Sequence, residues 1–381
     1  MEICNHDLCT GCFACKSICP KGAIEKKTDR LGRTVPVVNE ELCVNCGLCE
    51  KACPTVTPPT FRESKVCYAA WSKLEEDRNT CASGGISTGI GRYVIEQGGV
   101  VFGTYFKPND NLVLEFGMAS SVEELERFKT SKYVQADTAD SYEKAKEQLD
   151  NGKLVLYVGS PCQIAGLYGF LRKDYENLLT VDIICHGVPP IEYLRDYQKS
   201  VCKGKIAEYA TFRGKDDFSM QFYSATNELL FKKEAKKDFY FKAFLDGLIY
   251  RENCYSCVYA QRNRVADFTI GDFWELDKST LKEDYNGKVS VILINSEKAS
   301  NYIENIKELF YLEKRSIEEA VRGNTQLREP AKAHDGRLGF LNTYPKKGVV
   351  VAIRKSGISK EIIIYGVKTF IKRVRRYIKK S

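Results

Sequence analysis

The chain of 381 residues is long enough to bury a large core and to form two or more units. Its composition, 43% hydrophobic and 28% charged, is globular and excludes a disordered chain. The net charge of +8 lies mostly in residues 368–381, which contain seven Lys or Arg and no acidic residue, so the remainder carries only +1. This distribution argues against a broad nucleic-acid surface and for a basic tail.

Neither a membrane span nor a secretory leader is expected. No apolar run approaches the ~18 residues that a span requires, and the start MEICNHDLC has neither a basic segment nor an apolar stretch. The sequence therefore predicts a cytoplasmic protein. Disulfides do not persist in that compartment, so the 16 cysteines indicate metal or redox chemistry.

The predicted elements begin after a cysteine-rich segment (1–54) and a proline-rich linker (54–60). Strands are expected where β-branched and aromatic residues gather, and helices where N-cap and acidic first-turn signals precede an apolar period. The alternation of the two predicts an α/β layer structure with mostly parallel strands. Expected strands are 66–71, 99–106, 111–118, 153–158, 178–185 and 289–295; expected helices are 84–98, 121–128, 141–152, 162–171, 191–201 and 299–310.

The N-terminal segment repeats one cysteine pattern. CTGCFACKSICP (9–20) and CVNCGLCEKACP (43–54) both read Cys-x2-Cys-x2-Cys-x3-Cys-Pro. Three close thiolates hold one 4Fe–4S cluster, and the fourth, before proline, ligates the neighbouring cluster. Two zinc sites are the alternative, but tetrahedral zinc has no use for interlocked runs of four. The expected ligand sets are Cys9, Cys12, Cys15 and Cys53 for one cluster, and Cys43, Cys46, Cys49 and Cys19 for the other. Cys4, Cys67 and Cys202 fit no ligand spacing and are expected to be bystanders.

Four further cysteines occupy informative positions. Cys162 (GSPCQ) and Cys185 (IICHG) each follow an apolar strand, and Cys254 and Cys257 form a Cys-x2-Cys pair. Because the carboxyl ends of parallel strands face one crevice, these thiols make a set of four. That number suits a third 4Fe–4S cluster or a structural zinc. A nucleophilic Cys162 and an inert core thiol remain as alternatives.

The motifs then follow one another in a familiar order. CASGG (81–85), TSKYVQ (130–135), GSPCQIAGL (159–167), ICHGVP (184–189) and Cys-x2-Cys…RVADFTIGDFW (254–274) resemble the beta subunits of coenzyme F-420 hydrogenases and dehydrogenases. The resemblance reaches to about residue 275, behind a bacterial 2x4Fe–4S ferredoxin domain. It implies FAD and a cluster, rather than zinc, on Cys162, Cys185, Cys254 and Cys257. The implied fold is an α+β ferredoxin-like domain (1–60), an α/β domain with a mixed, mostly parallel sheet (61–350), and a basic amphipathic helix (351–381).

The flavin contacts that the resemblance implies lie in three motifs. Free backbone N–H groups at a helix start would hold a pyrophosphate, and a lysine near the flavin would stabilise its reduced form. A turn glycine pair and a solvated lysine are the plainer interpretations, and Asp272 either orients a ligand or caps a turn. The candidate residues are Ser83, Gly84, Gly85, Ser131, Lys132, Tyr133 and Asp272.

The functional expectation combines these sites. A flavin exchanges hydride with an organic partner, while clusters pass single electrons to ferredoxin or another redox protein. The resemblance implies coenzyme F-420 as hydride partner, or a biosynthetic intermediate, since bacterial relatives often accompany surface-polysaccharide genes. A non-catalytic electron-transfer subunit of a larger complex is the alternative. The basic helix, with Ile363, Val367 and Phe370 on one face, makes an anionic membrane surface a candidate partner.

Overall fold

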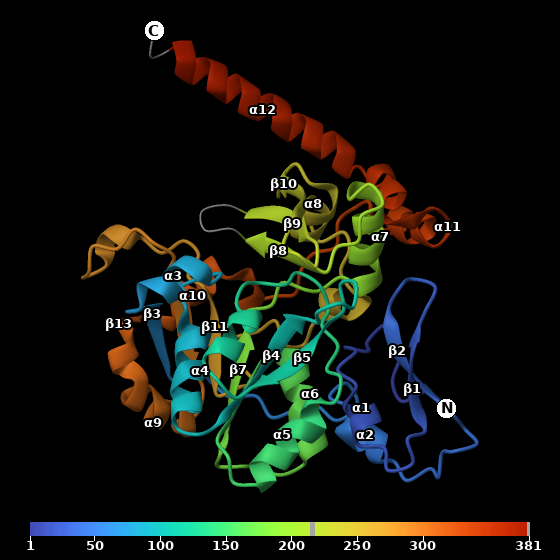
Figure 1. Ribbon diagram of the computed structural model, residues 1–381, viewed down its shortest axis with the longest axis vertical. Coiled ribbons are helices and arrows are strands. Elements are labelled where there is room, and N and C mark those ends of the chain that lie inside the picture. Colours follow the sequence, from blue (N-terminus) through green and yellow to red (C-terminus); the bar gives the residue numbers. More distant parts are fainter. Residues whose placement is uncertain (214–217, 379–381) are drawn as a thin grey trace.

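The computed structural model describes residues 1–213 and 218–378, and the side chains up to residue 371. Its largest part is an eight-stranded sheet in the order β13-β3-β12-β11-β7-β6-β4-β5 (Figure 1). The strands of this sheet are β3 (Val66–Ser72), β4 (Val100–Phe106), β5 (Leu114–Ala119), β6 (Val155–Gly159), β7 (Leu178–Ile183), β11 (Phe268–Asp272), β12 (Ser290–Ile294) and β13 (Phe310–Arg315).

The centre of this sheet is parallel and its flanks are antiparallel. β11, β7, β6 and β4 run in one direction, whereas β12, β3, β13 and β5 are added by antiparallel pairing. Three of the seven neighbour pairings are therefore parallel. Two successive antiparallel pairings turn β3 back into the direction of β11, β7, β6 and β4, so five of the eight strands run one way and the expected mixed sheet is present. Residues 273–289, which join β11 to β12, contain a 3-10 turn (Lys278–Thr280) and not the α-helix that usually links parallel strands.

Helices cover both faces of the sheet. Successive strand residues point to opposite faces, so Tyr157 of β6 packs with residues of α5 and α6, and Leu156 packs on the other side with residues of α4 and α9. The result is a three-layer α/β/α arrangement. These helices are α3 (Glu75–Thr80), α4 (Ile86–Glu96), α5 (Ser141–Asp150), α6 (Pro161–Leu171), α7 (Ile191–Val201), α9 (Glu297–Ile306) and α10 (Ile317–Gly323).

The helix expected over 121–128 is instead a 3-10 helix, Glu123–Phe128. Leu125 is buried in the core beneath α4, and Phe128 packs against the same core. These two side chains are three residues apart, and a 3-10 helix places positions i and i+3 on one side. The 3-10 segment thus turns both side chains toward the same core.

The N-terminal segment is small and lies against α6 (Figure 1). Each of its two helices starts after a residue with positive φ, Phe13 and Gly47, so the two cysteine runs fold alike. Gly166 and Gly169 of α6 allow the close approach, because a Cβ at Gly166 would lie 2.9 Å from Cys12 and one at Gly169 would lie 2.3 Å from the Ala52 carbonyl oxygen. Its elements are α1 (Ala14–Ser17), α2 (Leu48–Ala52) and the antiparallel hairpin of β1 (Ile24–Thr28) and β2 (Thr34–Val38).

A three-stranded sheet and the C-terminal helices complete the molecule. The small sheet lies beside the upper edge of the large one in Figure 1, and α12 projects away from the body. Residue 351, the expected start of the basic helix, falls inside α11, which has a break at Gly348; the basic helix begins at Ile358. None of the described helices combines the length and apolarity that crossing a bilayer requires. The elements are β8 (Tyr209–Arg213), β9 (Phe218–Tyr223), β10 (Leu229–Glu234), α8 (Phe239–Leu245), α11 (Arg337–Lys355) and α12 (Ile358–Ile378).

Candidate redox site

The first cavity of the N-terminal segment is lined by cysteines from both sequence repeats. Cys9, Cys12 and Cys15 of the first run lie around it together with Cys53 of the second run. Backbone N–H groups point at the sulfurs, for example from Gly11 to Cys9. Such N–H···S contacts set cluster potentials. The crossing of Cys53 to the first run is the arrangement that the proline-terminated motif predicts.

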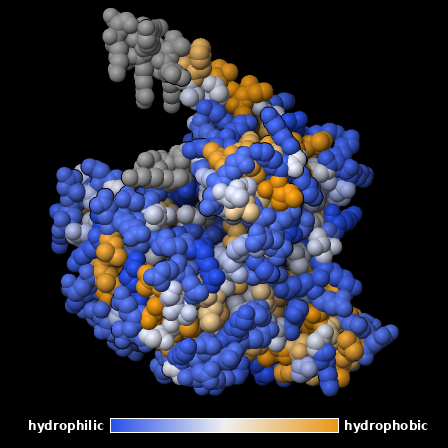
Figure 2. Space-filling view, in the orientation of Figure 1, coloured by the Kyte–Doolittle hydropathy of each residue, from blue (hydrophilic) through white to orange (hydrophobic). Residues whose placement is uncertain are grey.

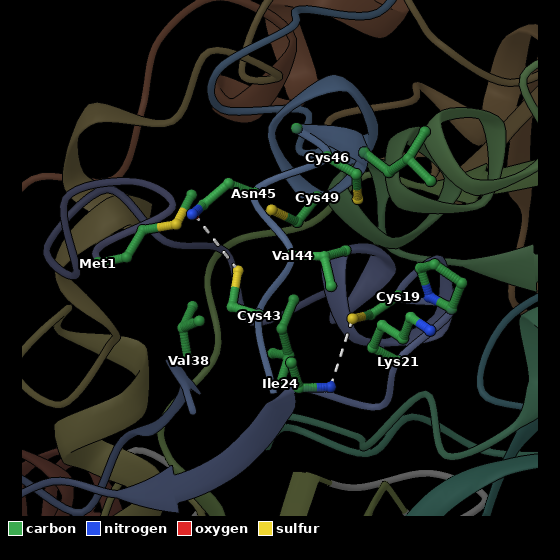
Figure 3. Close-up of a pocket in the computed structure, with 14 residues that line it drawn as sticks. Met1, Cys19, Lys21, Ile24, Val38, Cys43, Val44, Asn45, Cys46 and Cys49 are labelled. Carbon is green, nitrogen blue, oxygen red and sulfur yellow. Dashed lines mark hydrogen bonds between the residues drawn. The ribbon is translucent and has the colours of Figure 1, made fainter. Parts of the chain in front are cut away.

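The second cavity is formed by Cys19, Cys43, Cys46 and Cys49, and Figure 3 shows these four cysteines around it. The Ala23 N–H donates to the Cys19 Sγ at 3.3 Å. Cys46 is exposed to solvent, whereas the four cysteines of the first cavity are buried. The second group is therefore the one that a partner in solution reaches.

The third group lies at the carboxyl edge of the parallel strands. Cys162 stands in the first turn of α6 directly after β6, and Cys185 follows β7. A capping box fixes that turn: Ser160 is the N-cap, Pro161 comes first in the helix, and the Gln163 amide oxygen accepts from the Ser160 N–H at 3.0 Å. GSPCQ is therefore a helix-starting sequence that holds one thiol at the sheet edge.

Cys254 and Cys257 complete this group from the segment after α8. The charges of Cys254, Cys162 and Cys257 all act on Cys185, so the four sulfurs are close neighbours. Burial raises the pKa of Cys162 to about 12 and that of Cys254 to about 11. A metal must displace these protons to bind. The raised pKa also leaves a nucleophilic Cys162 without support, since the thiolate is the reactive form.

The cysteine sulfurs of the described residues are not gathered as closely as tetrahedral zinc ligands are. Zinc–sulfur bonds of about 2.3 Å in a tetrahedron bring all four sulfurs to about 3.8 Å from one another. Within residues 1–213 and 218–371, no three cysteine sulfurs all lie within 4.8 Å of each other. A cubane cluster, with its own sulfides between the irons, holds its cysteines further apart.

A buried ion pair fixes the third group. Arg264 follows Cys257 by seven residues and reaches Asp182 of β7 at 3.1 Å, with both side chains at most 2% exposed. Arg264 also donates to the Tyr259 carbonyl oxygen at 2.9 Å. It thereby ties the loop behind Cys257 to the strand that leads to Cys185.

A second buried arginine lies between the first and third groups. Arg251 is 1% exposed, donates to the Cys9 carbonyl oxygen at 3.1 Å and to the Gln135 side chain at 2.8 Å. Its charge acts on Cys9, Cys254 and Cys162. Burial lowers the pKa of Arg251, but an arginine remains charged in proteins. The two groups therefore share one buried positive charge.

Comparison with known proteins agrees with this arrangement. Residues 152–320 match the family model for the C-terminal part of the coenzyme F-420 hydrogenase/dehydrogenase beta subunit, and residues 8–56 match that for a 4Fe-4S dicluster domain. The resemblance expected from the sequence is thus confirmed, and residues 8–56 are an iron–sulfur domain.

Two individual proteins are similar to this chain over part of its length. The F(420)H(2) dehydrogenase of Methanosarcina mazei has an F subunit that is 25% identical over 193 residues, which cover 48% of this chain and 55% of the relative. The chain thus matches just over half the length of that curated protein. The xenon-derivatized F-420-reducing NiFe hydrogenase complex from Methanosarcina barkeri aligns with a TM-score of 0.47 and 15% identity, covering 82% of this chain and 93% of that one.

Part of the expected flavin set is engaged elsewhere. The Gly84 N–H donates to the Ser290 Oγ at 2.9 Å, and Ser83 bonds to the same hydroxyl. The expected free N–H at Gly84 is therefore absent, because β12 passes beside this turn. Gly85, with φ 84°, starts α4.

Other expected flavin residues form a polar network at the carboxyl edge of the large sheet. Asp272, at the end of β11, is ion-paired with Arg213 at 2.6 Å. Tyr133 interacts electrostatically with Arg213 and Asp272, and its ring stacks on Phe244. The network joins the large sheet to the small one.

A large cavity opens next to Lys132. It encloses about 1210 Å³ of space, open solvent included. Lys107, Arg127 and Lys129 also line it, together with Glu126 and Glu208, so basic side chains are in excess. Lys129 is ion-paired with Glu126. The Lys132 ammonium donates to the carbonyl oxygens of Phe128 and Lys129, and burial lowers its pKa to about 7. Among the expected flavin residues within the described chain, only Lys132 lines this cavity.

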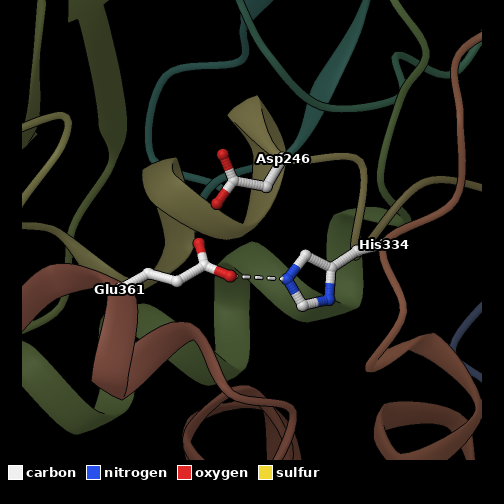
Figure 4. Close-up of side chains that lie close together, drawn as sticks. All are labelled: Asp246, His334 and Glu361. Carbon is white, nitrogen blue, oxygen red and sulfur yellow. Dashed lines mark hydrogen bonds and ion pairs between the residues drawn. The ribbon is translucent and has the colours of Figure 1, made fainter. Parts of the chain in front are cut away.

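A separate polar cluster holds α12 against the body. Asp246, His334 and Glu361 lie together (Figure 4), with their ligand atoms within 4.8 Å. Lys242 is ion-paired with both carboxylates, and the Gly336 N–H donates to His334 Nδ1, which leaves Nε2 to donate to Glu361 at 3.0 Å. The Lys242 ammonium already neutralises the two carboxylates, so the cluster needs no metal ion. Its hydrogen bonds and ion pairs instead attach α12 to the body.

The sequence reasoning missed the residues that hold the groups in place. Arg264 and Arg251 were overlooked because their partners, Asp182, Cys9 and Gln135, are distant in the chain. Their charge and their position beside the Cys-x2-Cys pair were the available signals, since a charged residue in a buried stretch requires a partner.

Proposed function

We propose that this chain is an iron–sulfur flavoprotein oxidoreductase, which moves electrons between an organic hydride carrier and a one-electron protein carrier. The observation that carries the proposal is the series of three thiol groups, from exposed Cys46 through the buried first group to Cys162 at the sheet edge. Cys12 packs on Gly166, one helical turn after Cys162. We assign a 4Fe–4S cluster to each group, with the third on Cys162, Cys185, Cys254 and Cys257.

The chain's own residues define the path between the first and third groups. Tyr259 interacts electrostatically with cysteines of both groups. These are Cys12 and Cys53 of the first group and Cys162 and Cys257 of the third. Arg251 favours the reduced, more negative state of both clusters. The apolar packing around these residues excludes water, which strengthens that interaction.

FAD is the second part of the proposal. The cavity beside Lys132 has an excess of basic side chains, and these suit a pyrophosphate. A bound flavin would supply two-electron hydride chemistry beside one-electron clusters. Lys132, whose pKa is lowered to about 7, would gain a proton when an anionic group binds next to it.

The hydride partner that we propose is coenzyme F-420, after the substrate in the name of the Methanosarcina mazei relative. In a host without F-420, the proposed hydride partner is a biosynthetic intermediate, for example one of surface-polysaccharide synthesis. Ferredoxin or another redox protein is the proposed one-electron partner. Leu42 and Val44 stand exposed next to the second cavity, and apolar side chains gather at the lower right of Figure 2, over the N-terminal segment.

A non-catalytic electron-transfer subunit is the second candidate function. The Methanosarcina mazei relative is one subunit of a dehydrogenase, which favours this alternative. Anaerobic purification with iron, sulfide and flavin quantified separates the two. About twelve irons and one FAD per chain would support the flavoenzyme function. The flavin absorbance should then bleach when a reduced deazaflavin, NADH or reduced ferredoxin is added. About eight irons without flavin leaves only the electron-transfer function.

The basic helix suggests peripheral contact with an anionic membrane at the inner face. In α12, Ile363, Val367 and Phe370 are exposed, each by more than half. Such a face inserts into a lipid interface while the lysines and arginines meet anionic head groups. Liposome co-sedimentation of the full chain and of a chain ending at residue 357 tests this contact. Equal binding of both proteins to anionic vesicles would remove it.

A further inference from the structure

The first cavity contains one cysteine more than a 4Fe–4S cluster needs. Cys4 lines this cavity together with Cys9, Cys12, Cys15 and Cys53. The lining of the second cavity, in contrast, contains its four expected ligands and no further cysteine within the described chain. The extra thiol is therefore specific to one of two cavities built from the same motif.

Cys4 lies between two of the expected ligands. Its thiol neighbours Cys53 and Cys9, which line the same cavity and act on it electrostatically. Cys4 therefore faces the same space as the four expected ligands and is available to a cluster held there.

The position of Cys4 is fixed by its surroundings. The preceding residue, Ile3, is buried in a small core with Cys15, Ile24 and Cys53, and Cys4 packs against the same core. The N-terminal ammonium pairs with Glu40. By comparison, the other cysteines outside the three groups lie elsewhere: Cys67 is in β3, and Cys81 contacts Thr88. Cys4 is thus held at the cavity by packing on both sides.

We propose that Cys4 is a reserve ligand of the first cluster, which replaces Cys9 or Cys53 when either is lost. The inference rests on the proposed cluster assignment. In the exchange, the Cys4 thiol loses its proton as its sulfur binds iron, and the displaced thiolate takes up a proton. No iron changes its oxidation state. The spare thiol makes the buried cluster tolerant of losing one ligand, which the exposed second cluster is not.

The test uses alanine substitutions in the full chain, because alanine offers no oxygen ligand. Cys9→Ala and Cys53→Ala are each compared with the same change combined with Cys4→Ala, after anaerobic reconstitution. We expect each single variant to keep its full iron and sulfide, and each double variant to lose about four irons per chain. Equal iron loss in single and double variants, or insolubility of both single variants, would overturn the proposal.

A labelling readout follows the exchange directly. In the native holoprotein, Cys4 is expected to react with iodoacetamide when mild denaturant partly opens the N-terminal segment. In Cys9→Ala the Cys4 thiol should be protected from the same reagent. Mass spectrometry detects the labelled cysteine. Cys4 remaining reactive in Cys9→Ala contradicts the proposal. Cys12→Ala and Cys19→Ala are the matched controls, since the cysteines that act most strongly on Cys4 are Cys9 and Cys53. Both controls should lose about four irons with Cys4 present; if they lose none, the cluster assignment itself fails.

Discussion

The two regions that bear cysteines differ in how the chain assembles them. In the N-terminal segment, short runs bring three thiols together locally, and the surrounding apolar core is small, with Ile3 and Ile24 as its buried aliphatic residues. At the sheet edge, four thiols come from three separate segments, and the α/β framework and the Arg264–Asp182 pair hold them. Under the proposed cluster assignment, the first region would fold around its clusters, whereas the protein framework would hold the second region before a cluster binds.

Removing all clusters should therefore separate the two regions most strongly. A chelator under anaerobic conditions should unfold residues 1–54, because metal binding supplies the folding free energy of such small cores. The α/β body should keep its structure. Hydrogen exchange with mass spectrometry measures both regions at once. If the amides of β1 and β2 stayed protected from hydrogen exchange after all iron was removed, the expected difference between the two regions would be wrong.

Deleting one ligand of the third group should remove that cluster alone. Cys185→Ala is expected to reduce iron from about twelve to about eight per chain, with the N-terminal clusters intact in electron paramagnetic resonance spectra. Cys67→Ala is the control, since Cys67 is a buried cysteine of β3 outside the groups. Unchanged iron in Cys185→Ala would exclude a third cluster.

Breaking the buried ion pair should damage only the site built by the fold. Arg264→Met leaves Asp182 uncompensated, at a cost of about 3–5 kcal/mol in the free energy of unfolding. Denaturant unfolding measures the loss. The matched control is Arg262→Met, whose pair with Glu318 is exposed and contributes about 0–1 kcal/mol. Similar losses for both variants would show that Arg264 has no special role.

The basic cavity of the body should show a pH dependence that the N-terminal segment lacks. The pKa of Lys132 is lowered to about 7, so its positive charge is present below pH 7 and is lost as the pH rises through that value. FAD should bind about tenfold more tightly at pH 6 than at pH 8, following the protonated fraction.

Fluorescence titration measures this affinity. Lys132→Arg, which stays charged, should bind equally at both pH values, and Lys132→Met should bind weakly at both. A wild-type affinity independent of pH would remove Lys132 from the flavin site.

The smallest effect is expected where the two regions meet. Arg251→Gln removes a positive charge shared by the first and third clusters, so both should become harder to reduce. An interaction of about 1 kcal/mol corresponds to a shift on the order of 50 mV toward negative potential. Redox titration followed spectroscopically measures it. The second cluster, and an exposed Arg30→Gln control, should be unaffected; a uniform shift of all clusters would contradict the shared charge.

Sequence reasoning succeeded where chemistry is local and failed where it depends on tertiary contacts. The spacing of Cys9 to Cys53 encodes which thiols meet, and strand ends predicted that Cys162 and Cys185 would be neighbours. No spacing rule covers Cys4, which reaches the cavity only because Ile3 is buried. The strand over 289–295 was foreseen, but its antiparallel direction depends on the helix-free connection before it. The free N–H expected at Gly84 was wrong because a distant strand supplies its acceptor.

The anchor of α12 has a consequence for the whole molecule. Lys242, Glu361 and His334 clamp only the first turn of a 21-residue helix, which spans about 30 Å. In Figure 1 this helix leaves the top of the longest axis, while the iron–sulfur segment lies toward the bottom. A molecule tethered by its tail would therefore hold the exposed Cys46 group away from the tether, open to carriers that diffuse freely.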